Sequence, residues 1–199
     1  MQTLDVVNAQ LATMGEHALA SLDETHRFLP DCLRILDTTN RNVQARGWYF
    51  NRETLTLTPS PVDGGLYLSN DILNIRSVAL RDRYQERLSL RAGRVYDGNN
   101  APFVFTQNKE VTAIRLIPFE DLDETAASFI SATAVARFQQ DYDGDSTKTR
   151  SLSQDAETAR IALMAEEIRQ AGSNILHSNH RLQSLKTLIN GARSYYLGR

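Results

Sequence analysis

Three aspartates at alternate positions are the first candidates for chemistry, because they resemble the opening of a calcium-binding loop. Asp141, Asp143 and Asp145 could surround a hard cation with carboxylate oxygens. The other positions do not fit, since Ser146 stands where such a loop needs its glycine and Leu152 where it needs its bidentate glutamate. We therefore predict a solvated loop between helices at residues 141–151 and no calcium site.

Two histidines near the end of the chain are the second candidates. A helix would place His177 and His180 on one face, where they could supply two ligands to a zinc ion. No Cys, Asp or Glu follows them, so we predict two surface histidines. Cys32, the one cysteine, lies among leucines and isoleucine, which indicates a buried apolar side chain and no disulfide. The sequence thus predicts neither a metal site nor a cofactor.

The acidic run Glu120–Glu124 is the candidate for hydrolysis. Paired carboxylates can hydrolyse a glycosidic bond when they face each other across a cleft. These carboxylates are instead neighbours at the start of a predicted helix, where negative charge interacts favourably with the free N–H groups. The sequence contains no nucleophile elbow, His-Glu-x-x-His helix or phosphate-binding glycine loop. We predict that the chain is not an enzyme, with an envelope- or polysaccharide-degrading hydrolase as the alternative.

A group of arginines in the middle of the chain is the candidate for binding nucleic acid. A formal net charge of −2 and a pI near 6.1 differ from the basic excess that most nucleic-acid-binding domains carry. Asp82 and Glu86 also interrupt the group, so we expect a solvated sheet face and keep a nucleic-acid-binding module as a further alternative. The arginines are Arg76, Arg81, Arg83, Arg87, Arg91 and Arg94.

Apolar residues at three- and four-residue spacing predict the helices that would position any site. A composition of 41% hydrophobic and 23% charged residues is that of a globular chain. Helices are predicted at residues 3–14, 29–46, 119–139 and 153–175. In the last of them, one side is formed by Ile161, Ala165, Ile168 and Ile175. No stretch is long and apolar enough for a membrane span, and no secretory signal is visible, so we expect synthesis in the cytoplasm and no membrane partner.

Residues 48–117 change to the period-two pattern of β-strands. Five or six short strands with short connections predict a small antiparallel sheet. Asp97-Gly98-Asn99-Asn100 is predicted as a hairpin turn, with Phe103-Val104-Phe105 pairing back. The predicted fold class is α+β, a bundle of about four helices with the sheet inserted between helix 2 and helix 3. Residues 1–176 would form a single domain.

The change of period occurs at a short segment that we call the seam, Arg46, Gly47, Trp48 and Phe50. Gly47 is suited to the left-handed backbone at a helix end. Trp48, the one tryptophan, follows at once and is predicted to bury its ring where the helices meet the sheet.

Residues 177–199 have the composition of an assembly arm. Their basic side chains give this segment a charge of +4, while the remainder of the chain carries −6. A short amphipathic helix followed by two tyrosines is suited to docking in a groove of a partner, although a frayed chain end has a similar sequence. The candidate partner-binding residues are Arg181, Leu182, Leu185, Lys186, Leu188, Ile189, Arg193, Tyr195, Tyr196 and Arg199.

Five blocks stand in a characteristic order along the chain: Asp5 to Gly15, Gln44-Ala45-Arg46-Gly47-Trp48, Gly93-Arg94-Val95-Tyr96-Asp97, Ile114-Arg115-Leu116 and Arg137-Phe138. In their order and spacing these blocks resemble the tail tubular protein A family, the head-to-tail adaptors of short-tailed phages. The resemblance covers roughly residues 4 to 176, and the run through the seam is its most specific part.

The resemblance implies a structural virion protein at the head-tail junction. Many copies, twelve in family members of this kind, would form a ring between the portal protein and a tail nozzle of the tail tubular protein B type. Tail fibres are a further possible partner, and DNA would only pass through the central channel. A small net charge suits such a channel, because each contact between a basic side chain and a phosphate would add a salt-dependent attraction and slow the passage of DNA.

Overall fold

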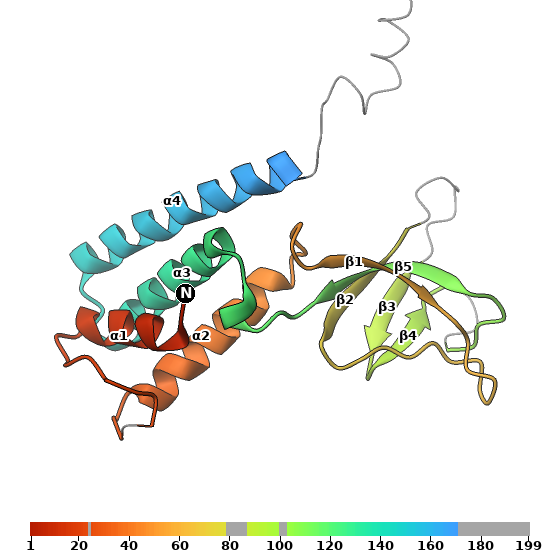
Figure 1. Ribbon diagram of the computed structural model, residues 1–199, viewed down its shortest axis with the longest axis horizontal. Helices are drawn as coiled ribbons and strands as arrows, with labels where there is room; N and C mark the ends of the chain where they lie inside the picture. Colours follow the sequence, from red (N-terminus) through yellow and green to blue (C-terminus); the bar gives the residue numbers. More distant parts are fainter. Residues whose placement is uncertain (24, 79–86, 100–102, 171–199) are drawn as a thin grey trace, which may run out of the picture. The chain divides into compact units, whose positions relative to one another are not determined.

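The computed structural model describes residues 1–23, 25–78, 87–99 and 103–170. The chain divides into two compact units, Met1–Leu163 and Met164–Arg199. The helices are α1 (Thr3–Thr13), α2 (Leu29–Gln44), the 3-10 turn η1 (Phe119–Asp121), α3 (Glu124–Tyr142) and α4 (Ser146–Gln170). The strands are β1 (Arg52–Leu57), β2 (Ile72–Ser77), β3 (Leu88–Arg91), β4 (Arg94–Asp97) and β5 (Lys109–Arg115). The described strands, β1 to β5, lie between α2 and α3 in the chain (Figure 1). The predicted α+β fold with an inserted antiparallel sheet is therefore confirmed.

Helices α1, α2 and α3 bury one apolar core together with the first part of α4. Leu11, Ile130, Phe138 and Leu163 are fully buried in it. Small residues on α3, among them Ala126 and Ala134, have no exposed surface and let the neighbouring helices approach closely. Each helix thus contributes an apolar stripe to a common interior.

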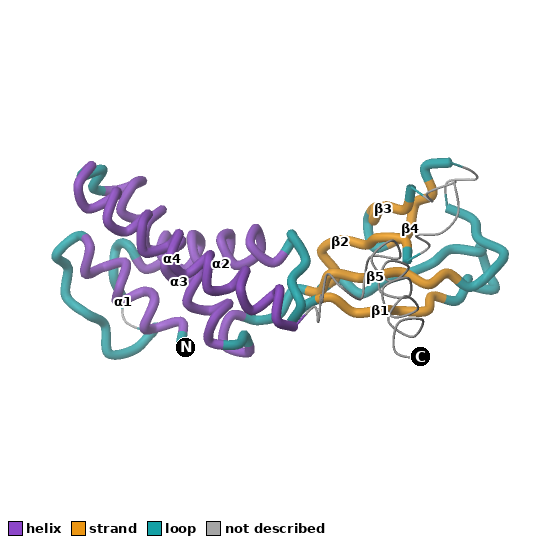
Figure 2. The backbone as a smooth tube through the Cα atoms, turned by 90° about the horizontal axis from the view of Figure 1, so that it is seen from above, coloured by secondary structure: helices purple, strands orange, loops and turns teal. Residues whose placement is uncertain are grey.

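The strands form a second core of their own. β5 lies between β1 and β2, and both pairings are antiparallel (Figure 2). β3 and β4 form a separate hairpin whose two-residue turn, Ala92 and Gly93, has positive φ at both positions, as a type I′ turn requires. Leu66, Val95 and Val111 are fully buried in this core.

The turn at Ala92 and Gly93 corrects the predicted hairpin. Asp97 is the last residue of β4, Gly98 and Asn99 form a bend, and Asn100 lies outside the described residues. The predicted returning strand at residues 103–105 is not a strand. Instead, the backbone N–H of Phe105 donates to Gly64 O at 2.9 Å. The sequence Asp-Gly-Asn favours a turn but does not show which strands the turn connects. In the structure, β4 pairs with β3 through the turn at Ala92 and Gly93.

The boundaries of the last two helices differ from the prediction. α3 begins at Glu124 rather than at residue 119, because Asp123 is its N-cap and accepts a hydrogen bond from Ala126 N at 2.9 Å. Residues 119–121 form η1 instead. α4 begins at Ser146 rather than at residue 153, since Asp145 Oδ1 accepts from the N–H groups of Thr147 and Lys148 at 2.8 and 2.9 Å. The predicted loop at 141–151 is therefore a short turn around Gly144, which has φ +68°.

The side of α4 that carries the isoleucines is not the side that is buried. Leu163 is fully buried, whereas Ile161 and Ile168 are 57% and 62% exposed. Residues 171–175 of the predicted helix lie outside the described residues. Within the described part of the chain, no helix is long and apolar enough to cross a membrane.

Candidate functional site

The chain passes between the helical core and the strand core twice, and three buried amides join the two crossings. One crossing runs from α2 to β1 and the other from β5 to η1. Asn40 and Gln44 of α2 and Asn51 before β1 are 5%, 0% and 0% exposed. Buried polar groups need hydrogen-bond partners, and these three find them across the crossings. We call Asn40, Gln44 and Asn51 the amide cluster.

Gln44 binds the second crossing through both ends of its amide. Its Nε2 donates to Ile117 O at 2.8 Å, and its Oε1 accepts from Ile117 N at 2.9 Å. The same Nε2 donates to Asn40 Oδ1 at 2.7 Å. The side-chain amide of Gln44 therefore pairs with the backbone N–H and C=O of Ile117, as the backbone of a neighbouring strand would. This pairing holds the segment that follows β5 against α2.

Asn51 binds three backbone groups at once. Its Nδ2 donates to Gln44 O at 3.0 Å and to Arg115 O at 2.9 Å, while its Oδ1 accepts from Trp48 N at 2.8 Å. The last carbonyls of a helix have no intrahelical partner, so the bond to Gln44 O also caps α2. Asn51 thus holds the end of α2, the start of β1 and the end of β5 together.

The seam residues lie around this cluster. Trp48 is 7% exposed, belongs to the helical core, and its Nε1 donates to Val43 O at 2.8 Å. Gly47 has φ +76°, and a Cβ there would lie 2.7 Å from Cδ1 of Ile114. Phe50 is half-buried against the helical core, and Arg46 is exposed. The structure therefore brings Gly47, Trp48 and Phe50 to the junction and leaves the Arg46 side chain outside it.

Two members of the amide cluster have a signal in the sequence. Asn40 and Gln44 are four residues apart and fall on the buried side of α2 that also carries Leu36 and Val43. A polar residue within an apolar stripe must find a partner, so two of them on one stripe indicate a buried network. Its partners, Asn51 and Ile117, are distant in sequence and could not be identified from spacing.

Arg115 of β5 lies between two carboxylates beside this junction. Its Nε and Nη2 donate to the two oxygens of Glu53, each at 2.9 Å, and its Nη1 donates to Asp71. The hydrogen bonds from Arg115 lower the pKa of Glu53 below its ordinary value of 4.5. A hydrogen bond from Ser69, and then those from Arg115, lower the pKa of Asp71 below 3.8. The group ties β1 and the turn before β2 to β5.

These shifts predict a loss of stability in acid. A carboxyl group whose pKa is lowered by folding stabilises the folded state above its unfolded pKa, and this contribution disappears as the pH falls through the folded value. We expect the free energy of unfolding to decline below about pH 4.5, the ordinary value for Glu53. The Arg115→Gln variant should show a shallower decline in urea unfolding between pH 5 and pH 3. An identical slope in both proteins would contradict this role of Arg115.

Two carboxylates of the acidic run have structural partners. Asp123 caps α3 with one oxygen and accepts from Tyr49 Oη with the other, at 2.7 Å. Glu120 Oε1 accepts from Thr3 N at 3.3 Å. Asp123 therefore has the predicted role at the start of its own helix, whereas Glu120 binds the first residue of α1.

Three of the arginines considered for nucleic acid are engaged with the sheet region or the seam. Arg94 donates to Asp63 Oδ2 at 2.8 Å, the guanidinium of Arg91 lies 3.5 Å from the ring centre of Tyr96, and Arg76 donates to Arg46 O at 3.1 Å. Arg87 is exposed, and Arg81 and Arg83 lie outside the described residues. No single basic surface follows from the described arginines.

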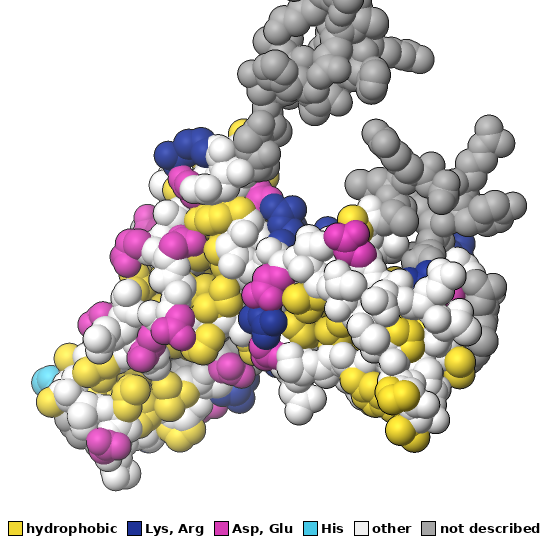
Figure 3. Space-filling view, turned by 45° about the vertical axis from the view of Figure 1, so that its right-hand side comes forward, with side chains coloured by type: hydrophobic (Ala, Val, Ile, Leu, Met, Phe, Trp, Pro, Cys, Tyr) yellow, Lys and Arg dark blue, Asp and Glu magenta, His cyan; other side chains and the backbone are white. Residues whose placement is uncertain are grey.

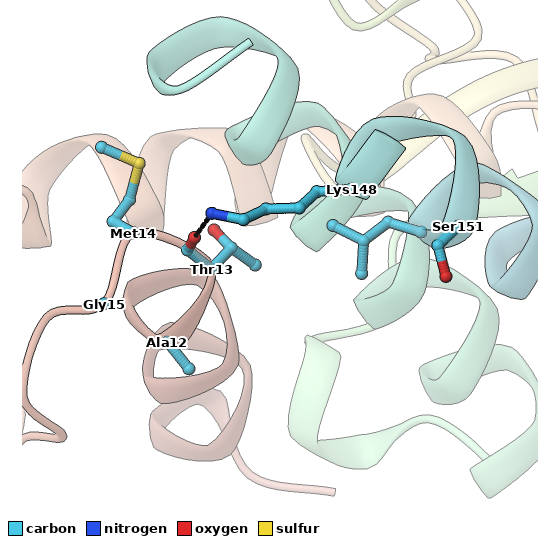
Figure 4. Close-up of a pocket in the computed structure, with 7 residues that line it drawn as sticks. Ala12, Thr13, Met14, Gly15, Lys148 and Ser151 are labelled. Carbon is cyan, nitrogen blue, oxygen red and sulfur yellow. Dashed lines mark hydrogen bonds between the residues drawn. The ribbon is translucent and has the colours of Figure 1, made fainter. Parts of the chain in front are cut away.

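A pocket of about 430 Å³ lies between the end of α1 and the first turns of α4 (Figure 4). Lys148 reaches across it, and its Nζ donates to Thr13 O at 3.1 Å and to Asp143 at 3.0 Å. A cation is favourable at the last carbonyls of a helix, and α1 has no basic residue in its own last turn. The one charged group of this pocket therefore joins two helices, and the pocket lining offers no reactive pair.

The remaining predicted sites fall on other parts of the chain. Asp143 pairs with Lys148 and Asp145 caps α4, so these two aspartates of the supposed calcium loop have roles at a helix boundary. Among the described residues, no three His, Cys, Asp or Glu side chains are grouped as a metal would require. His177, His180 and all the partner-binding candidates of the arm lie outside the described residues.

Comparison with known proteins gives two matches. The model of the tail tubular protein family matches residues 4–173. The chain is also similar to tail tubular protein A of Klebsiella phage KP34, with 24% identity over 170 residues, which is 85% of this chain and 88% of that protein. Both matches include the amide cluster, the seam and all the described strands.

Proposed function

Since the chain belongs to the tail tubular protein family and is thus a structural component of a phage tail, we propose that it is the head-to-tail adaptor. In this role several copies, with twelve as the expected number, form a ring between the portal protein and the tail nozzle. The ring leaves a channel for DNA. The protein acts by assembly with other virion proteins and not by catalysis, and it is located at the head-tail junction.

The observation that carries this proposal is the family match over residues 4–173. The described contacts agree with it, because residues considered for hydrolysis, for calcium and for nucleic acid each have a structural partner: Asp123 caps α3, Asp145 caps α4, and Arg94 donates to Asp63. Exposed apolar residues on α4 supply a surface for a neighbouring copy. Ile161, Met164 and Ile168 are 57%, 42% and 62% exposed and recur at helical spacing.

A contact between different surfaces of identical copies builds a ring when its rotation closes. The arm at residues 177–199 adds a further contact, ordered against an acidic or apolar surface of the portal or of the adjacent copy. Its charge of +4 and its leucines at helical spacing are the basis for this role.

The ring is tested in the portal-bound state, since the portal can template the assembly. Purified protein is mixed with its portal, and the complex is examined by native mass spectrometry and electron microscopy. We expect several copies related by cyclic symmetry. One copy per portal would contradict the proposal.

A further inference from the structure

An apolar groove of about 350 Å³ lies on the unit Met1–Leu163, between α2, the first residue of α1 and the segment that leaves β5. Leu36 and Phe119, which are 4% and 8% exposed, form part of its wall together with the half-buried Leu33 and Ile117. Asp37, an exposed residue of α2, adds a carboxylate to this apolar lining. The groove therefore offers apolar contact with a negative charge at its edge.

The amide cluster holds this groove in shape. Gln44 pairs with both backbone groups of Ile117, and Asn40 Nδ2 lies 3.4 Å from Ile117 O, so the wall formed by residue 117 is fixed to α2. At the other end, Thr3 N donates to Glu120 Oε1. A preformed groove binds a partner without the cost of ordering its own walls.

The helical part of the chain and the arm carry opposite charges. In the helical residues 1–47 and 118–163 the sequence has 8 basic and 15 acidic side chains, a charge of −7, whereas the arm carries +4. Figure 3 shows acidic side chains among hydrophobic ones on the helical part. The arm also has aliphatic residues at the spacing with which an amphipathic helix enters an apolar groove, Leu182, Leu185 and Ile189.

We propose that the groove receives residues 177–199 of a second copy of this chain. The leucines of the arm occupy the apolar lining, and Lys186 lies near Asp37. Each copy has one groove and one arm, so the contact joins unlike surfaces and can repeat from copy to copy around a ring. This inference rests on the proposed ring and identifies one contact that closes it.

A charge exchange tests the pairing in the full-length chain. Asp37→Lys should weaken assembly onto the portal at least tenfold, and Lys186→Asp should weaken it similarly. The double variant should regain most of the affinity, because the pair is restored with its signs exchanged. Asp23→Lys is the matched control, since it makes the same charge change at another exposed position of the helical unit and should leave assembly unchanged. Weakening by both single changes without recovery in the double variant would overturn the proposal.

Cross-linking identifies the occupant directly. A photoreactive phenylalanine derivative replaces Leu185, and ¹⁴N- and ¹⁵N-labelled copies are mixed before assembly on the portal. We expect cross-links from residue 185 to residues 33–37 or 116–119 in peptides of mixed label. Cross-links to the portal, or only within one copy, would overturn the docking proposal. Symmetric rings without cross-links to the groove would also overturn the docking proposal but would leave the proposed function intact. Failure to form any ring would instead reject the proposed function itself.

Discussion

Replacement of Trp48 by alanine is expected to lower the free energy of unfolding by about 3 to 5 kcal/mol, the range for emptying a large aromatic site in a core. Trp48 is 7% exposed within the helical core, and its indole N–H donates to Val43 O. The substitution removes the ring from the core and leaves a carbonyl at the end of α2 without this donor. Urea unfolding followed by circular dichroism measures the loss.

Trp48→Phe separates the two effects. Phenylalanine keeps most of the apolar volume but has no N–H group, so we expect a smaller loss, of about 1 to 2 kcal/mol. If Trp48→Ala costs less than about 1 kcal/mol, the ring does not stabilise the folded chain and Trp48 belongs to an assembly surface instead. Portal binding by the same variant would then identify that surface.

The parts of the fold that follow from local spacing were predictable from the sequence. Val7 and Leu11 mark α1, and the alternation Leu55 and Leu57 marks β1, because each pattern depends only on neighbours in the chain. Cys32 is buried as its surroundings indicated, and burial raises the pKa of its thiol to about 11. Local pattern and tertiary environment agree at these positions.

The parts that depend on distant partners could not be predicted in the same way. The spacing of apolar residues in α4 predicts a side with Ile161 and Ile168, whereas the buried residue of this helix is Leu163. Both sides of this helix carry apolar residues, so spacing alone cannot choose between them. The choice depends on what else binds the helix, and a second copy is the partner that we propose for the exposed side.

The amide cluster is a second feature that depends on residues distant in the sequence and so could not be predicted from spacing. Gly47 could be placed at a helix end from its type, and the structure gives it φ +76°. The reason that the helix ends there also involves Asn51, which accepts from Trp48 N and donates to Gln44 O. The role of a glycine at a helix end can be predicted from its residue type. The partners of Asn51 cannot, because they come together only when the two crossings lie side by side in the fold.

Asn51→Ala is expected to cost about 3 to 4 kcal/mol, although it removes only a small polar side chain. Asn51 is fully buried, and the change removes its hydrogen bonds to the N–H of Trp48 and to the carbonyls of Arg115 and Gln44, of which the Gln44 carbonyl keeps the bond from Gly47 N. A buried group that loses its hydrogen bond costs about 1 to 3 kcal/mol, and relaxation of the junction reduces the sum. Asn70→Ala is the matched control, because Asn70 is exposed and such changes usually stay within about 0.5 kcal/mol.

Asn51→Asp distinguishes hydrogen bonding from packing, since aspartate has nearly the same shape. Its carboxylate can accept from Trp48 N but cannot donate to the two carbonyls, and it brings a charge into a buried site. We expect Asn51→Asp to destabilise the chain at pH 7 at least as much as Asn51→Ala. Part of the stability should return as the pH falls toward 5, because protonation removes the charge and supplies one donor. Chemical unfolding of both variants at the two pH values gives the comparison. If Asn51→Asp is as stable as the parent at pH 7, the donated hydrogen bonds do not hold the junction, and the two crossings are joined by packing alone.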